Sequence, residues 1–373
     1  MEAKFYISDV LPTLSQALSV TNAKNALPIL ECFQISFKGD YAVVTTSDSE
    51  IWYSAKVNIE SDEERKLCIH ASQFVNALRN IDQNTIVRAK IDFSTTTATF
   101  VYDDKGSYFK LPFTTDEYPT ASVDTTNISE YKFPMPQSFL AEAIDKVVYA
   151  VSYDSLRPIM NGVHFDFKQD GLVTVASNAV KLGRFKNKSI THEMETSPSL
   201  TLSLKAANIL KSILVGEDNV LVCFNNNYIV VTCEKFKFLA RLVEGVYPKY
   251  EAVIPKESNI TVNIPKTDLL SALKRVSPMG NTTDELIQFH FNTNILTIRA
   301  ENIDFNTSAE ESMACEYYAA ELFIGFKSST LMDTLRNINS EIVAFDIIDP
   351  TRAVVLHAED KERFLALVMP MKL

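Results

Sequence analysis

Apolar side chains recur at helical spacing in six stretches of the chain. In the first stretch Val10, Leu14 and Ala17 fall on one helical face. The other stretches repeat this spacing, with polar residues on the opposite face. The pattern predicts six amphipathic helices, which occupy residues 8–20, 72–80, 137–150, 204–214, 266–276 and 327–338.

Between these helices apolar and polar residues alternate, which is typical of strands with one buried face. Residues 33–37 and 41–45 flank the polar turn Lys38-Gly39-Asp40, and this arrangement predicts a hairpin. Two further hairpins are predicted, at 163–167 with 172–176 and at 287–291 with 295–299. Other predicted strands cover 108–111, 219–224, 228–233, 236–242, 342–347, 353–357 and 364–368.

The order of these elements repeats along the chain. Leu11, Leu140 and Leu269 each open a helical stretch and are 129 positions apart. Tyr118-Pro119 and Tyr247-Pro248 repeat at the same step. This period exceeds the roughly 20–50 residues of a solenoid repeat and is close to the usual size of a domain. We therefore predict three copies of one domain, each with the order helix, strands, helix, strands.

The repeats define the domain organisation and the fold class. Polar linkers at about 114–129 and 244–259 each hold one of the repeated Tyr-Pro pairs. The predicted domains are residues 1–124, 125–253 and 254–373. Each is expected to be α+β, with antiparallel sheets and two helices on one face.

Composition indicates a globular protein without a membrane span. Hydrophobic residues make up 46% and charged residues 22% of the chain, and no apolar run approaches the roughly 18–20 residues of a spanning helix. The first residues, Met1-Glu2-Ala3-Lys4-Phe5, lack the pattern of a signal peptide. Five cysteines lie scattered without a C-x-x-C spacing, which favours reduced thiols over disulfides or zinc ligands. The expected location is therefore the cytoplasm.

Motifs of catalysis are missing from the sequence. Of nine glycines the nearest two, Gly162 and Gly171, are nine positions apart, which excludes phosphate-binding glycine loops. The five histidines are isolated, and His164 has the setting of an ordinary strand residue. The acidic pairs and triplets at 103–104 and 62–64 fit solvated turns better than metal sites. We predict no catalytic residue, no metal and no cofactor.

The distribution of charge has two interpretations. The six helical stretches carry nine basic and five acidic residues, so they are net +4 in a chain of −11, and the remainder is about −15. Lysine and arginine are good helix formers on solvated faces, which is one explanation. The other is that the helices share one mildly basic surface while the rest of the molecule repels polyanions.

Four segments resemble one family over the whole length of the chain. They are Leu27-Pro28-Ile29-Leu30, Asn161-Gly162, residues 242–250 and the closing residues Val368 to Leu373. In this order they are similar to the bacterial DNA polymerase sliding clamp, the beta subunit of the replicative polymerase. The resemblance implies head-to-tail dimers of three-domain subunits that form a ring. Helices would line the central hole, and sheets would form the outer layer.

The resemblance implies a non-catalytic processivity factor that meets duplex DNA through phosphates, without reading sequence. A weakly basic lumen would permit sliding, because a strongly basic one would release many counterions and bind tightly. The residues expected to face DNA are Lys24, Arg79, Lys146, Lys205, Lys211, Arg275 and Arg336.

The resemblance also implies a pocket for short peptide motifs from the replicative polymerase, the clamp loader and repair proteins. By matching motifs, this pocket would be built from Arg157, Met160, Ser177, Ala179, Lys181, Leu182, Pro248, Val253, Leu367, Met369, Pro370, Met371, Lys372 and Leu373. Met369 to Met371 have a simpler interpretation as a buried final strand. The sequence departs from the family at 177–182, where Ser-Asn-Ala-Val-Lys-Leu replaces Thr-Asp-Gly-His-Arg-Leu.

The expected dimer joins Phe109 and Leu111 of the first domain to Pro278 and Met279 of the third. Closure of the ring would remove the unpaired sheet edges at the two ends of the subunit. Two alternatives belong to other classes: a peptide-binding adaptor that does not encircle DNA, and a hydrolase. The hydrolase would need a nucleophile and a base, which the sequence does not offer.

Overall fold

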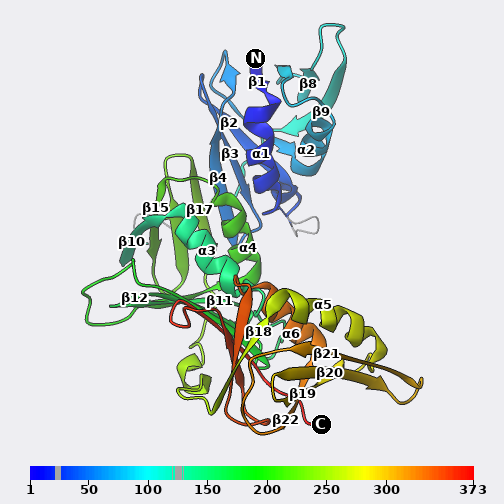
Figure 1. The fold of residues 1–373 in the computed structure, drawn as a ribbon. Helices are drawn as coiled ribbons and strands as arrows, with labels where there is room; N and C mark the ends of the chain where they lie inside the picture. The colour runs from blue at the N-terminus through cyan, green and yellow to red at the C-terminus, as the bar shows by residue number, and fades with distance from the viewer. Residues whose placement is uncertain (22–26, 120, 122–127, 129) are drawn as a thin grey trace. The chain divides into compact units, whose positions relative to one another are not determined.

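The computed structural model describes residues 1–21, 27–119, 121, 128 and 130–373 (Figure 1). Its α-helices coincide with the six predicted stretches. They are α1 (Ile7–Leu18), α2 (Ala71–Arg79), α3 (Gln137–Val148), α4 (Leu204–Ile213), α5 (Lys266–Val276) and α6 (Ser328–Arg336). Among the described helices none is long and apolar enough to cross a membrane.

The strands repeat in the same order three times. The first repeat holds β1 (Glu2–Tyr6), β2 (Cys32–Phe37), β3 (Ala42–Ser47), β4 (Ile51–Val57), the short β5 (Glu60–Ser61), β6 (Lys66–His70), β7 (Ile86–Asp92), β8 (Thr97–Val101) and β9 (Tyr108–Thr114). The second holds β10 (Tyr131–Pro136), β11 (Gly162–Lys168), β12 (Gly171–Ser177), β13 (Lys181–Asn187), β14 (Ser199–Ser203), β15 (Asn219–Phe224), β16 (Tyr228–Thr232) and β17 (Phe236–Arg241). The third holds β18 (Ile260–Pro265), β19 (Leu286–Asn292), β20 (Ile295–Asn302), β21 (Thr307–Ala314), β22 (Leu322–Lys327), β23 (Ile342–Ile347), β24 (Val354–His357) and β25 (Phe364–Val368).

The predicted order within a repeat needs one correction, because a strand also precedes the first helix of each repeat. β1 passes into α1 without a loop, and β10 and β18 pass likewise into α3 and α5. In β1 the side chains of Ala3 and Phe5 are buried while their neighbours are exposed, as expected for a strand with one covered face. The three hairpins predicted from the alternation are confirmed as antiparallel pairs.

The chain forms two compact units that divide the second repeat. Unit 1 comprises Met1–Ala141 and Asn208–Leu242. Its strands form one antiparallel sheet in the order β10-β15-β16-β17-β4-β3-β2-β6-β9-β8-β7-β1-β5. Helices α1 and α2 lie side by side against this sheet (Figure 1). Val10, Leu14 and Ala17 of α1 are fully buried, and burial of the valine and leucine side chains contributes about 1.5–3 kcal/mol each.

Unit 2 comprises Glu142–Ala207 and Val243–Leu373. It contains an eight-stranded sheet in the order β14-β11-β12-β13-β25-β24-β23-β18 and a four-stranded sheet in the order β21-β20-β19-β22. Helices α5 and α6 pack against each other in this unit. α5 lies on β20 and β21, and α6 lies on β22 and β25.

Consecutive repeats join where a strand of one repeat pairs with a strand of the next, and both junctions align their strands in the same way. Within unit 1, β4 pairs with β17 and places Trp52 opposite Leu239. Within unit 2, β13 pairs with β25 and places Leu182 opposite Leu367. The two junctions are therefore structural counterparts, and the second of them carries the candidate site.

A polar cluster lies on the third repeat beside β23. The Asp346 carboxylate accepts hydrogen bonds from Thr261 Oγ1 at 2.7 Å, from His357 Nε2 at 3.2 Å and from the Lys361 ammonium. Burial raises the pKa of Asp346, but the hydrogen bonds from His357, Lys361 and Thr261 outweigh burial and hold this pKa well below its usual range. The hydrogen bond to Asp346 raises the pKa of His357.

This cluster makes the stability of unit 2 depend on pH. The folded pKa of His357 is raised, so its stabilising contribution is complete below the unfolded value of about 6.5 and is lost as pH rises through the folded pKa. We expect His357→Gln to lower the free energy of unfolding more at pH 5.5 than at pH 8.5, by up to about 1.5–3 kcal/mol. Urea unfolding followed by hydrogen exchange in β23 and β24 measures this difference. Equal losses at both pH values would contradict it.

Candidate functional site

A buried apolar cluster crosses four strands of unit 2, at the place where the sequence predicts the peptide pocket, and we refer to it as the floor of the predicted groove. Its buried side chains come from β12, β13, β24 and β25 and from the segment that links the second repeat to the third. They are Val173, Val175, Leu182, Tyr247, Tyr250, Ala353, Val355, Leu365 and Leu367, with the partly buried Ile159 and Ile254 packed against them.

Strand register explains why these side chains meet. Leu367 of β25 lies opposite Leu182 of β13 on one side and opposite Val355 of β24 on the other. Residues opposite each other in antiparallel strands project from the same face of the sheet, so the three side chains form a continuous apolar row. The structure thus brings together two predicted pocket residues, Leu182 and Leu367.

Two short 3-10 turns border the floor. One is Pro158–Met160, in which Met160 is buried, and Arg157 just before it donates from Nε to Asp154 Oδ2 at 2.9 Å. The other is Tyr250–Val253, where Tyr250 is buried while Val253 remains 57% exposed.

The rim segment between β12 and β13 is a tight turn held by side-chain oxygens. Ser177 Oγ donates to the Lys181 carbonyl at 2.9 Å and accepts from the Ala179 amide at 3.2 Å. Asn178 Oδ1 accepts from the Val180 and Lys181 amides at 3.1 and 2.9 Å. These bonds place Ala179 at φ 74°, in the left-handed region that favours glycine.

Replacing Ala179 by glycine should stabilise the protein. The left-handed conformation costs an L residue about 1–2 kcal/mol, whereas glycine loses only about 0.5–1 kcal/mol of chain entropy. We expect Ala179→Gly to raise the free energy of unfolding by up to about 1 kcal/mol, measured by urea or thermal unfolding. Ala176→Gly, in the buried and regular part of β12, is the matched control and should destabilise. A loss of stability for Ala179→Gly would contradict the strain argument.

Lys181 does not join the groove, although it was predicted to line it. Its Nζ lies 3.4 Å from Asp333 Oδ2 on α6 and 5.4 Å from the centroid of the Tyr149 ring. Successive strand residues point to opposite faces, so β13 directs Leu182 to the groove and Lys181 to the helices.

The segment Met369–Leu373 (the C-terminal segment) follows β25 and is held at two points. The Met369 amide donates to the Val180 carbonyl of the rim turn at 2.8 Å. The Met371 amide donates to the Gly325 carbonyl of β22, also at 2.8 Å. Met369 is 37% and Leu373 is 51% exposed, so this segment is no buried strand. Pro370 lies between the two anchors, and Lys372 is exposed beyond them.

The predicted pocket residue Pro248 lines a cavity of about 460 Å³, whose wall also includes Tyr247 and Tyr250 of the floor. Within that cavity wall the His164 ring stacks on Tyr247 at a centroid distance of 4.4 Å, and its Nδ1 lies 3.1 Å from Thr201 Oγ1. Burial lowers the pKa of His164 to about 4, so the imidazole is neutral at physiological pH. The part of the chain that the structure describes holds no cluster of three or more metal-binding side chains.

Sequence reasoning missed several residues that shape the groove. Val175, Val355 and Ile159 belong to the floor or pack against it, and Gly325 holds the C-terminal segment. The alternation in residues 172–176 and 353–357 was a usable signal for the two valines. Gly325 gave no signal, because it lies far from the other pocket residues in the sequence.

The junction between the first and second repeats differs from this site in what covers its apolar row. Trp52 and Leu239 occupy the positions of Leu182 and Leu367, and Val230 lies beside Leu239 as Val355 lies beside Leu367. There Ile128 of the chain itself sits on the cluster with only 1% of its surface exposed. In this junction the apolar row is already covered.

Basic residues predicted to face DNA lie at helix ends. Arg79 and Arg336 are the last residues of α2 and α6, both exposed, and Lys211 lies in the last turn of α4. Lys205 is exposed in the first turn of α4, and the predicted Lys24 lies outside the described residues. Basic side chains at helix C-termini also interact favourably with the helix dipole, which gives these positions a structural explanation too.

Three of the predicted DNA-facing residues have partners within unit 2. Arg275 forms a bidentate ion pair with Glu311, through Nε at 2.9 Å and Nη2 at 2.5 Å. Arg336 Nη1 lies 3.3 Å from Asp333 Oδ1. The Lys146 Nζ lies 5.8 Å from the centroid of the Phe364 ring, and burial lowers the pKa of the Lys146 ammonium.

The residues predicted for the dimer lie at sheet edges. Phe109 stacks on Phe100 of β8 at 4.8 Å, and among the described residues β9 pairs with β6 only at Phe113 and Thr114. In unit 2, β21 ends the four-stranded sheet. Beside it, the Met279 carbonyl accepts a hydrogen bond from Thr307 Oγ1 at 2.9 Å, and Met279 is 41% exposed. Pro278 precedes Met279 in the same short turn.

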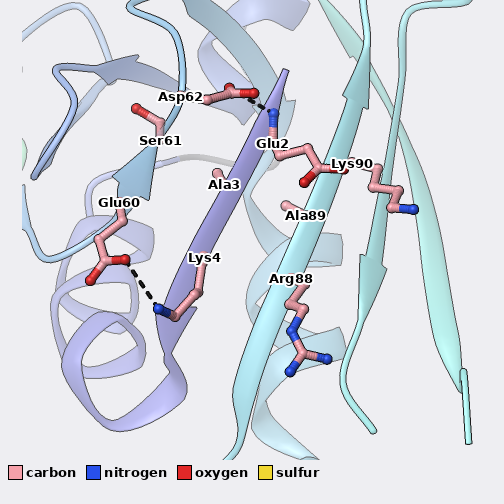
Figure 2. A pocket seen from close by; sticks show the side chains of 9 residues that line it. All are labelled: Glu2, Ala3, Lys4, Glu60, Ser61, Asp62, Arg88, Ala89 and Lys90. Atoms are coloured by element: carbon pink, nitrogen blue, oxygen red, sulfur yellow. Dashed lines mark hydrogen bonds and ion pairs between the residues drawn. The ribbon is translucent and has the colours of Figure 1, made fainter. Parts of the chain in front are cut away.

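A pocket of about 360 Å³ lies in unit 1 (Figure 2). Two of its acidic side chains have partners within the pocket: Lys4 Nζ lies 3.2 Å from Glu60, and Asp62 accepts from the Glu2 amide at 2.8 Å. The one hydroxyl in its lining, Ser61, donates to the Gly39 carbonyl. This pocket supplies no pairing of a nucleophile with a base.

Three family models match successive parts of the chain. The N-terminal, central and C-terminal domains of the DNA polymerase III beta subunit match residues 4–122, 134–249 and 251–372. The beta sliding clamp of Treponema pallidum is 22% identical over 369 residues, covering 97% of each chain. That of Streptococcus pneumoniae strain R6 is 24% identical over 377 residues, covering 96% of each.

Solved structures agree on the fold. A sliding clamp (DNA polymerase III subunit beta) from Pseudomonas aeruginosa bound to griselimycin superposes with a TM-score of 0.92 at 23% identity, covering 100% of both chains. The DNA polymerase III beta subunit from Thermotoga maritima gives 0.90 at 20% identity, covering 100% of this chain and 99% of its own. With all three domain models matched in order, the chain belongs to the DNA polymerase III beta subunit family, the bacterial sliding clamps.

Proposed function

We propose that this protein is a cytoplasmic DNA sliding clamp that encircles duplex DNA as a homodimer and tethers the replicative polymerase and other replication and repair proteins. The observation that carries the proposal is the match of three successive clamp domains along one chain. We assign these domains to residues 1–124, 125–253 and 254–373. The protein itself catalyses no reaction and acts as a processivity factor.

Ring closure is supported by strand edges in the first and third repeats: β21 ends its sheet, and among the described residues Tyr108–Pro112 of β9 pair with β8 on one side only. β9 in unit 1 and β21 in unit 2 each present an edge, and exposed edges tend to pair with another chain. Pairing of one subunit's β9 with its partner's β21 would be heterologous, and two such contacts close a ring. Lys110 on β9 and Glu310 on β21 bring opposite charges to these edges.

The charge distribution suits topological retention. A ring that encloses DNA needs little contact energy, and a strongly basic lumen would oppose sliding because counterion release favours tight binding. The ion pairs of Arg275 and Arg336 with acidic neighbours reduce the free positive charge further. The acidic remainder of the chain disfavours binding of DNA to the outside.

The groove of unit 2 suits several peptide partners. Its floor is aliphatic and aromatic, and its rim carries the flexible side chain of Met369. Methionine adapts to different apolar ligands, which favours a shared site for many partners. We therefore assign the peptide-binding role to this groove, with Val180 in place of the family's histidine on the rim.

Retention on circular DNA tests the proposed function. Protein loaded by a clamp loader onto a nicked plasmid should stay bound through gel filtration and should dissociate when the plasmid is linearised. Binding to short linear duplexes should be weak and should fall further with salt. Stable or sequence-specific binding to a linear oligonucleotide would contradict the proposal, whereas peptide binding without retention would favour the adaptor.

Charge reversal in the lumen should impair retention selectively. We expect Glu at Arg79, Lys146, Lys205, Lys211 and Arg336 to shorten the lifetime on nicked circles about tenfold or more, because each phosphate contact contributes about 0.2–1 kcal/mol. Dimerisation and peptide binding should persist. The matched control reverses five exposed lysines on strands and loops, at positions 66, 90, 132, 235 and 256. Equal loss in both variants would show that net charge alone is responsible.

A further inference from the structure

The C-terminal segment adds to the free edge of a strand in the third repeat. β22 is the last strand of the four-stranded sheet, with β19 on its other side. Met371 forms an isolated antiparallel bridge with Gly325 of β22, through a 2.8 Å hydrogen bond from its amide to the Gly325 carbonyl. An edge strand readily accepts such an addition, because its backbone groups on that side are otherwise unpaired.

Gly325 is the residue that permits this close approach. A Cβ atom at this position would lie 2.8 Å from the Met371 carbonyl oxygen, 2.9 Å from Leu373 Cδ2 and 3.0 Å from Leu286 Cδ1. Gly325 has no left-handed φ, so its backbone conformation does not itself require glycine. The requirement comes from the packed segment, and any side chain at 325 would push that segment away from β22.

The second anchor of the segment lies on the groove itself. The Met369 amide donates a hydrogen bond to the Val180 carbonyl of the rim turn. Pro370, whose φ is fixed by its ring, links Met369 to Met371. Met369 is thereby held at the rim with 37% of its surface exposed. A wall that is ordered before a partner arrives loses less entropy on binding, which raises affinity.

We propose that Gly325 is a positioning residue for the peptide groove. By holding Met371 on the edge of β22 it presets Met369 and Pro370 as a groove wall for short peptides with apolar anchors. This role rests on the proposed peptide-binding function. Because the C-terminal segment packs directly on Gly325, the proposed role acts through this segment.

The test combines Gly325→Ala with two readouts. Hydrogen exchange should show a protected Met371 amide in the wild type and an unprotected one in the variant. The affinity for a fluorescent Gln-Leu-x-Leu-Phe-type peptide should fall about tenfold in the full-length dimer. In a background that lacks residues 369–373, Gly325→Ala should leave the residual affinity unchanged. Phe323→Ala, at an exposed position of the same strand, should change neither readout.

Two results would overturn the proposal: equal exchange of the Met371 amide in wild type and variant, or an equal loss of affinity in the shortened background. If Gly325→Ala fails to fold, Met371→Pro removes the donor N–H while keeping Gly325 and should give the same loss of affinity. A wild-type protein that binds no peptide but shows the protected amide would contradict the proposed function and leave the contact with β22 confirmed.

Discussion

Removal of residues 369–373 is expected to lower the affinity for a Gln-Leu-x-Leu-Phe-type peptide by roughly two decades or more. The deletion removes Met369, whose amide is bonded to the rim turn, and Met371, whose amide is bonded to β22. Burial of a leucine or phenylalanine anchor contributes about 1.5–3 kcal/mol, and two lost contacts of this kind correspond to at least a hundredfold in affinity. The dimer should persist, because the deletion leaves the edges of β9 and β21 intact.

Titration of the fluorescent peptide into intact and shortened protein measures this effect, and light scattering checks the dimer. Val215→Ala combined with Tyr318→Ala is the matched control, since it removes two apolar side chains that are 77% and 81% exposed and do not belong to the predicted pocket. We expect the control to retain most of the affinity. Equal affinities of the intact and the 369–373 deletion protein, both folded, would place the peptide site elsewhere.

The helices and hairpins were predictable because their signals are local. Each helix buries a stripe at a spacing of three and four residues, as Phe74, Val75 and Leu78 do in α2. The hairpins combine alternation with short polar turns. Periodicity therefore located these elements, and the long repeat located the three copies.

The strands that precede the helices were not predictable in the same way. β10 and β18 each end at a proline, Pro136 and Pro265, which suggests a helix start more strongly than a strand end. Both strands pair with distant partners, β15 and β23, that follow the second helix of the same repeat. Their stability comes from this non-local pairing, and a local pattern does not contain it.

Part of the candidate site was predictable from local sequence, and part depends on contacts between distant segments. Leu182 and Leu367 were found through sequence motifs, and the register of β13 and β25 brings them face to face. The direction of Lys181 depends on which face of β13 is covered by α6, and its partner Asp333 is 152 positions away. The contact of Gly325 with Met371 likewise joins segments that no local signal connects.

The pairing of predicted DNA-facing residues follows from tertiary structure as well. Arg275 has the charge and the position on α5 that are expected of a phosphate-binding residue. In the structure, however, Glu311 of β21 pairs with its guanidinium. The sequence predicts where basic residues lie on a helix. It does not predict which acidic strand residue lies beside them, and this decides how much charge is left for DNA.

Charged substitutions at Leu111 and Met279 are expected to convert the dimer into monomers. Leu111 lies on the edge part of β9, and Met279 lies beside the first residue of β21. An unpaired charge buried in an interface costs several kcal/mol, so Leu111→Asp combined with Met279→Asp should raise the dissociation constant about a thousandfold or more. Because a monomer cannot enclose DNA, retention on nicked circles should be lost at the same time.

Size-exclusion chromatography with light scattering over a range of concentrations measures this change, and circular dichroism confirms that both units remain folded. Val215→Asp combined with Ile342→Asp is the matched control, since it introduces the same two charges at residues that are 77% and 53% exposed away from these edges. The control should remain a dimer. If the Leu111 and Met279 variant also runs as a folded dimer that is retained on circular DNA, the subunits meet through other edges, and the pairing of β9 with β21 is wrong.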